Sequence, residues 1–229
     1  MIGVTPHERA YLAPFFAFLA LLLLGEVVKS VGEGYAHWAL AHPQYWLFPL
    51  QIVVCGGLLL HYRAYYGELR VARGFAVAVL AGALAFALWI APQSLFGASP
   101  RLDGFRPHFF GADGPAYWSN LLLRFARMTL IVPLVEELFW RGFLLRYCVR
   151  DDFQHVPFGT FTWTSFLVVS VAFCFEHTQP DWPAALLTSA LYNWVAYRSR
   201  SLLACVLAHA VTNLLLGLYI LKTQQWGFW

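Results

Sequence analysis

The sequence predicts an all-α integral membrane protein, a polytopic bundle in which about seven transmembrane helices form a single domain over residues 1–229. Hydrophobic residues make up 60% of the chain and charged residues only 12%, about half the charged share of a water-soluble domain. Tryptophan and tyrosine cluster at the ends of the apolar runs, where aromatic side chains favour the membrane–water interface. This composition excludes a water-soluble globule and a disordered chain.

Six of the predicted spans are nearly free of charge, namely residues 10–25, 43–62, 74–96, 156–175, 182–197 and 201–221. The first run lacks a convincing small-residue cleavage site at its end, so we interpret it as a retained span and not as a signal peptide. A further segment, 119–149, is apolar but is interrupted by the charged residues Arg124, Arg127, Glu136, Glu137, Arg141 and Arg146. The connection 92–118 contains four prolines and four glycines, which predicts an irregular lid or linker.

Arginines are concentrated in alternate connections, and this pattern predicts the orientation of the chain. They lie at Arg9 and in the connections 63–73, 146–150 and 198–200. Because positive charge favours the cytoplasmic side, the N-terminus is expected inside and the C-terminus outside. We expect a multi-pass protein of a plasma membrane, the inner membrane of a bacterium.

Several partners and functions are disfavoured by the sequence. The net charge of +3 is scattered, with no basic run that could follow a phosphate backbone, so no nucleic acid partner is expected. The four cysteines show no C-x-x-C spacing, so they predict apolar packing residues and not a zinc knuckle or a disulfide framework. The absence of inverted-repeat symmetry disfavours a transporter. The oligomeric state is not predicted.

The charged segment carries the first candidate functional residues. A charged group at the centre of a transmembrane helix costs about 2.5–3.5 kcal/mol on insertion scales, so such residues are usually partnered or functional. Glu137 precedes Arg141 by four residues, and this spacing predicts an ion pair on one helix face. Glu136 is rotated by about 100° from its neighbour, which leaves its carboxylate free for another helix. Glu136 is therefore the better candidate base, although this motif alone is compatible with a structural role or with catalysis.

Two further polar pairs lie on later spans. Phe173 and His177 share one helix face, so the phenyl ring can shield the imidazole from lipid, and a purely structural histidine is the alternative. His209 and Asn213 lie one turn apart and supply two N–H donors. Such donors could bond a neighbouring helix or an oxyanion. Together, the three motifs supply the base, the proton partner and the donors that a hydrolase needs.

The order E-E-x-x-x-R, F-x-x-x-H and H-x-x-x-N on separate spans resembles the CAAX protease and bacteriocin-processing family of intramembrane endopeptidases. The similarity covers about residues 127–216, within an expected family-like catalytic core at 119–222. More narrowly, residues 66–69, 88–90, 136–146, 176–177, 192–194 and 226–229 resemble the CAAX-protease-related branch that accompanies exosortase and PEP-CTERM sorting systems.

The resemblance implies that Glu136, with His177, activates a water and that His209 and Asn213 stabilise the oxyanion. Glu137 and Arg141 would be supporting residues. It implies no metal and no cofactor, and as partners it implies membrane lipid and a membrane-tethered or lipid-modified peptide substrate. The chain departs from the family in its sixth span, where Ala190, Asn193 and Ala196 occupy a region that often contains glycines.

Two other functions remain open from the residues alone. Two histidines and a carboxylate could instead form a catalytic zinc site. The cluster could also be an interhelical network in a non-enzymatic scaffold or immunity-type protein. Under the predicted orientation the site faces the outer half of the membrane. The roles of Glu176, Tyr192 and Asn193 stay undecided between site and packing.

Overall fold

A computed structural model describes residues 4–32, 34–35 and 37–229. Within these ranges the regular structure is helical and contains no strand, which confirms the all-α prediction. The α-helices are α1 (Pro6–Val31), α2 (Trp38–Ala41), α3 (Gln44–His61), α4 (Phe75–Leu95), α5 (Pro115–Ala126), α6 (Val132–Glu137), α7 (Leu145–Tyr147), α8 (Trp163–Ala172), α9 (Trp182–Ser199) and α10 (Leu202–Thr223).

Short 3₁₀ and π segments fill most of the connections between these helices. The 3₁₀ turns are η1 (Arg63–Tyr65), η2 (Gly67–Arg70), η3 (Pro107–Phe110), η6 (Phe153–His155), η7 (Phe173–Glu176), η8 (Gln179–Asp181) and η9 (Trp226–Phe228). The π segments are η4 (Arg127–Ile131) and η5 (Leu138–Leu144). Because η4 and η5 lie between α5, α6 and α7 without a break, these elements form one central helix.

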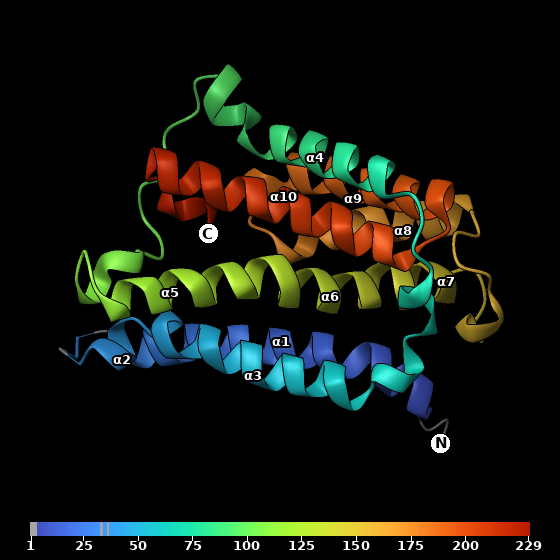
Figure 1. Cartoon of the computed structure of the whole chain (residues 1–229), viewed down its shortest axis with the longest axis horizontal. Helices are drawn as coiled ribbons and strands as arrows, with labels where there is room; N and C mark the ends of the chain where they lie inside the picture. Colours follow the sequence, from blue (N-terminus) through green and yellow to red (C-terminus); the bar gives the residue numbers. More distant parts are fainter. Residues whose placement is uncertain (1–3, 33, 36) are drawn as a thin grey trace.

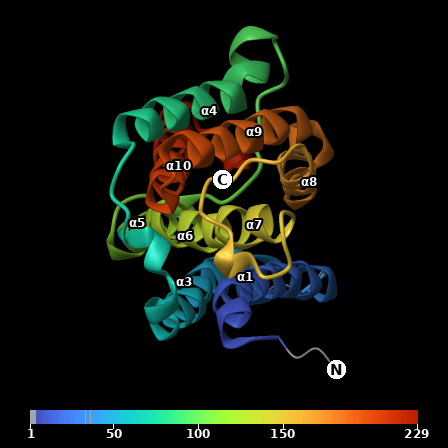
Figure 2. The same ribbon diagram turned by 90° about the vertical axis from the view of Figure 1, so that its right-hand side faces the viewer.

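The helices are arranged in layers (Figures 1 and 2). The helices α1 and α3 form one outer layer, the central helix forms the middle layer, and α4, α8, α9 and α10 form the other outer layer. The N-terminus and the arginine-containing connections α3–α4, α7–α8 and α9–α10 lie at one end of the bundle, while the C-terminus lies towards the other. The central helix is therefore covered on both sides.

Four helices are long and apolar enough to span a membrane, and these are α1, α3, α4 and α10. The remaining predicted spans do form helices, but α8 is short and α9 is less apolar. The central helix carries buried charge and contains two π segments. The structure thus supports an integral membrane protein, whereas a count of seven spans is not confirmed.

The close approach of α4 and α10 fixes the layer that carries the site. A Cβ atom added at Gly82 of α4 would lie 2.4 Å from the backbone oxygen of Ala208. Small residues allow such backbone contact between helices in a membrane. The contact also lets Thr212 of α10 donate from its hydroxyl to the carbonyl of Gly82, at 2.8 Å. The position of α10 against the rest of the bundle is therefore defined at the depth of His209 and Asn213.

The two π segments lie on either side of Glu136 and Glu137. A π turn widens the helix by one residue and leaves backbone carbonyls without their usual intrahelical partners, and such turns are frequent at functional sites. In η4, the carbonyl of Met128 accepts a hydrogen bond from the Asn213 side chain at 2.7 Å. The irregularity of the central helix thus links it to α10.

Candidate active site

A cavity of about 370 Å³ lies between the central helix, η7, α9 and α10, and four of the predicted site residues line it. These are Glu136, His177, His209 and Asn213. They come from three separate segments of the chain: Glu136 lies in α6, His177 follows η7, and His209 and Asn213 lie in α10. The structure therefore brings the carboxylate, the two imidazoles and the amide around one hollow.

Glu136 is the carboxylate of this cavity that the protein leaves free. Its side chain belongs to α6 and is 9% exposed. Its carboxylate lines the cavity and forms no hydrogen bond or ion pair with the side chains that the structure describes. The helix rotation that separates it from Glu137 accounts for this, since Glu137 faces Arg141 and Glu136 does not.

Glu137 joins Arg141 to His209. Its Oε1 atom accepts from Arg141 Nη1 at 3.1 Å, and both side chains are fully buried. The ion pair predicted from the i,i+4 spacing is thus present. The same oxygen lies 3.0 Å from His209 Nδ1. Because a carboxylate oxygen accepts, Nδ1 carries the proton, and Nε2 is the ring nitrogen that His209 has left for the cavity.

Arg141 is held by several hydrogen-bond acceptors, and one of them is the side chain of Asn193. Arg141 donates to Asn193 Oδ1 at 3.1 Å, to the Ser189 carbonyl at 3.2 Å and to the Ser189 hydroxyl at 3.0 Å. Asn193 in turn donates to the Ser170 hydroxyl at 3.1 Å. Asn193 therefore orients the arginine and packs beneath the site without lining the cavity.

Tyr192 does line the cavity. Its hydroxyl donates to the Thr212 hydroxyl at 2.6 Å, and its ring centroid lies 5.5 Å from that of His209. The ring also lies beneath the Arg141 guanidinium at 5.4 Å. Tyr192 thus packs against the imidazole of His209 within the cavity wall.

His177 is positioned by a backbone hydrogen bond and two aromatic rings. It ends η7 in an extended conformation, and its Nδ1 atom lies 3.1 Å from the Phe173 carbonyl. Since a carbonyl accepts, Nδ1 is protonated and Nε2 is an acceptor. The rings of Phe173 and Trp89 lie 5.0 Å and 5.1 Å from the imidazole, which agrees with the shielding expected from the F-x-x-x-H spacing.

Glu176 contributes a second carboxylate to the cavity wall. Trp140 Nε1 donates to its Oε2 atom at 2.8 Å, while Oε1 is buried without a hydrogen-bond partner among the described residues.

Asn213 lines the same cavity, and its side-chain amide donates one hydrogen to the Met128 carbonyl. One amide hydrogen of Asn213 therefore remains for a ligand.

Sequence reasoning missed the residues that close the cavity towards the end of the bundle where the C-terminal residues lie. They include Arg101, Asp181 and the C-terminal residues 227–229. Arg101 forms an ion pair with Asp181, and the Gly227 amide donates to the Arg101 carbonyl at 2.9 Å. The sequence singled out residues 226–229 only as part of a family resemblance, and only the fold brings the connection 96–114 onto this C-terminal segment. Arg127 also lines the cavity, and its charge within an apolar segment was the available signal.

The donor geometry bears on the zinc alternative. Within the ranges that the structure describes, no group of three histidine, cysteine, aspartate or glutamate residues is arranged to hold a metal ion. The cavity histidines instead place their Nδ1 atoms on Glu137 and on a backbone carbonyl.

A comparison with protein families matches residues 118–215 to the model described as type II CAAX prenyl endopeptidase Rce1-like. The match begins in α5, ends in α10 and includes all six predicted site residues. It confirms the resemblance to the CAAX protease family over this part of the chain, and it gives no support for the exosortase-associated branch. No curated protein and no solved structure is similar enough to compare with the chain.

Proposed function

With a CAAX protease family sequence over residues 118–215 as the premise, we propose that this membrane protein is an intramembrane endopeptidase that cleaves a membrane-tethered or lipid-modified peptide. The observation that carries the proposal is the unpaired carboxylate of Glu136 in one cavity with His177, His209 and Asn213. We propose residues 119–222 as the catalytic core, because the motif residues all lie within it.

The first step is the activation of water by Glu136 and His177. Glu136 takes a proton from the water, and the oxygen attacks the carbonyl carbon of the scissile peptide bond. The Nε2 atom of His177 accepts a hydrogen bond from the same water, as its tautomer allows. When the C–N bond breaks, the proton moves from Glu136 to the leaving amine, so that the base of the first step is the acid of the second.

His209 and Asn213 stabilise the negative charge on the tetrahedral oxygen. Asn213 donates its remaining amide hydrogen. His209 donates from Nε2 in the form whose ring carries both protons, with Nδ1 held on the Glu137 carboxylate. Loss of one oxyanion-hole donor typically costs a factor of about 10²–10³ in kcat. Every group used in these steps is a side chain of this protein.

The position of the cavity in the bundle indicates the side of the membrane that it faces. Arg101, Asp181 and the C-terminal residues line it towards the end where the C-terminus lies, whereas the arginine-containing connections lie at the opposite end of the bundle. If those connections are cytoplasmic, the active site opens to the outer side of the membrane. A cysteine introduced at Gln179 should then be labelled by a membrane-impermeant thiol reagent in intact cells. Labelling only after permeabilisation would show that the orientation is the opposite one.

The function is tested by comparing cells that carry the wild-type protein with cells that carry Glu136→Gln, His177→Ala or Asp151→Asn. Asp151 is an exposed carboxylate of the α7–α8 connection and serves as the matched control. Proteomics of membrane-bound and released fragments should show a cleavage product in the wild type and in Asp151→Asn only. Turnover that survives in both Glu136→Gln and His177→Ala would overturn the assignment, and a preserved biological role without cleavage would favour a scaffold.

Purified wild-type protein tests metal independence. Its zinc content is measured by elemental analysis, and its turnover is measured before and after chelator treatment. The proposal expects turnover to persist after chelation, while stoichiometric zinc with chelator-sensitive turnover would support the zinc mechanism.

A further inference from the structure

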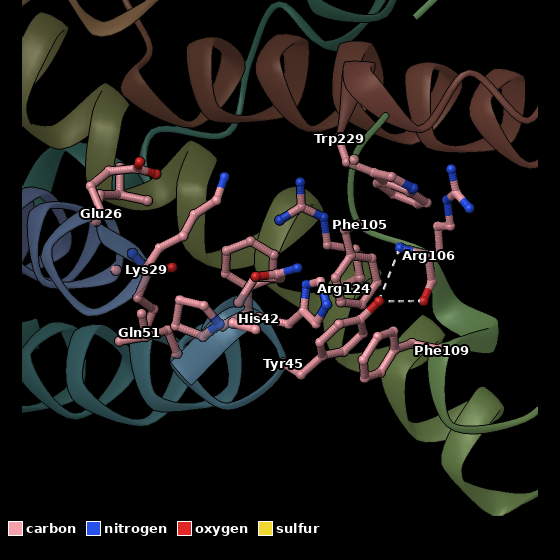
Figure 3. Close-up of a pocket in the computed structure, with 18 of the residues that line it drawn as sticks. Glu26, Lys29, His42, Tyr45, Gln51, Phe105, Arg106, Phe109, Arg124 and Trp229 are labelled. Carbon is pink, nitrogen blue, oxygen red and sulfur yellow. Dashed lines mark hydrogen bonds between the residues drawn. The ribbon is translucent and has the colours of Figure 1, made fainter. Parts of the chain in front are cut away.

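A second and larger cavity, of about 580 Å³, adjoins the catalytic cavity (Figure 3). It lies between the C-terminal half of α1, the N-terminal half of α3, the connection 103–109 and α5. Leu22, Arg124 and Trp229 line both cavities. These residues therefore mark the junction between them.

Arg124 is a buried cation at this junction. Its side chain is 4% exposed, and its guanidinium carbon lies 4.4 Å from the ring centroid of Phe48 and 5.2 Å from that of Trp229. Its Nε and Nη1 atoms have no hydrogen-bond partner among the described residues. A buried charge without a hydrogen-bonded counter-ion is costly, so the protein maintains this arrangement at the expense of stability.

The other arginines of the central helix differ from one another in whether they have a counter-ion. Arg141 and Arg146 of the same helix are each neutralised by a glutamate, at 3.1 Å and 2.8 Å. Arg127 lies near Arg124 and donates to the neutral Gln51 side chain at 2.6 Å. No described carboxylate forms an ion pair with Arg124 or Arg127. Arg124 and Arg127 therefore both line the catalytic cavity without a hydrogen-bonded counter-ion among the described residues.

The distance along the central helix relates this charge to the reacting centre. Arg124 and Glu136 are 12 residues apart (136 − 124) and both line the catalytic cavity. At a rise of 1.5 Å per residue this separation is about 18 Å. An extended peptide covers the same distance with about five residues. An anionic group bound at Arg124 would therefore belong to a peptide whose scissile bond is about five residues away.

We propose that Arg124 forms a carboxylate-binding site at the junction of the two cavities and that it binds a carboxylate of the peptide substrate. The planar guanidinium can form two parallel hydrogen bonds with a carboxylate. A peptide origin is favoured because the cation is shared with the catalytic cavity and is buried, whereas a lipid phosphate would be met by the exposed Arg106 at the mouth. This inference rests on the proposed function and specifies its substrate.

The test is a binding measurement that requires no turnover. Purified protein with Glu136→Gln, in a non-ionic detergent, is titrated with two N-acetylated hydrophobic pentapeptides that differ only in a C-terminal carboxylate or carboxamide. The carboxylate peptide should bind about tenfold or more tightly than the carboxamide, the ratio expected from one charge-assisted contact. Arg124→Gln on this background should bring the ratio close to one.

Matched variants keep the result interpretable. Arg106→Gln removes a cation at the mouth of the same cavity, with a side chain that is 48% exposed, and should leave the ratio unchanged. Arg124→Met provides a second uncharged replacement that suits the aromatic surroundings, so that a folded variant can be chosen from its thermal unfolding curve.

Four results would overturn the proposal: equal affinity for the two peptides, no binding of either, a ratio that Arg124→Gln and Arg124→Met leave unchanged, or displacement of the carboxylate peptide by inorganic phosphate or phosphatidylglycerol at equal concentration. The last result would assign the site to phosphate groups. None of them bears on proteolysis itself, whose failure would be seen separately as the absence of cleavage by the protein that retains Glu136.

Discussion

The adjacent glutamates Glu136 and Glu137 should respond in opposite ways to the same isosteric change. In Glu137→Gln, the fully buried Arg141 loses its carboxylate and His209 loses the anion at Nδ1. In Glu136→Gln, no hydrogen bond or ion pair of the described residues is lost. Glu137→Gln should therefore lower the stability of the protein, and Glu136→Gln should abolish turnover.

The magnitudes follow from burial. Removing one partner of a buried ion pair costs about 3–5 kcal/mol, and for a chain of this length 1 kcal/mol shifts Tm by about 2–4 °C. Glu137→Gln should thus lower Tm by about 6–20 °C. Glu136→Gln should change the free energy of unfolding by less than about 1 kcal/mol, while loss of a general base lowers turnover by a factor of about 10²–10⁴.

The buried cysteines supply the assay. Cys55 and Cys205 are fully buried free thiols, so a thiol-reactive fluorogenic dye reports unfolding in detergent when it reaches them. Cys148 is partly exposed and gives the baseline signal. Equal Tm values for the two variants would refute the structural role of Glu137, and cleavage by Glu136→Gln would refute its role as base.

Three further predictions concern other parts of the molecule. Gly82→Val should lower Tm because its side chain meets a backbone carbonyl of α10 at 2.4 Å, an overpacking that costs about 1–3 kcal/mol, while Gly57→Val, which has open space around its Cβ position, should not; equal Tm values would contradict the packing argument. Asn193→Ala should lower Tm by removing an acceptor of Arg141, and because Asn193 does not line the cavity, turnover per folded molecule should fall less than in Glu136→Gln. Burial of Glu68, in the α3–α4 connection, opposes its ionisation, but Arg146 and the Tyr11 hydroxyl outweigh this and hold the pKa of the Glu68 carboxyl below its usual value. The stability from Glu68 is therefore complete above about pH 4.3, the ordinary pKa of a glutamate, and is lost as pH falls through the lowered pKa, so the acid-side slope of Tm should flatten in Glu68→Gln.

The charged central helix shows how far the sequence determined the site. The i,i+4 spacing of Glu137 and Arg141 is a local property, so it predicted an ion pair that the structure contains. The same rotation left Glu136 without a hydrogen-bond or ion-pair partner among the described residues. The roles of Asn193 and Arg124 were not accessible in this way, because their contacts involve residues that are far away in the chain.

The sequence by itself determined that the chain is an α-helical membrane protein and which polar residues are candidates for its chemistry, because composition, span length and helical spacing are local quantities. Its count of seven spans is not confirmed, since α8 is short and α9 is less apolar and buries several polar side chains. Only the tertiary structure decided that Glu137 accepts hydrogen bonds from both Arg141 and His209, and that Asn213 donates to a carbonyl of the π segment η4. It also decided that two cavities meet at Arg124. These features depend on the packing of helices from opposite ends of the sequence, and no short-range periodicity records it.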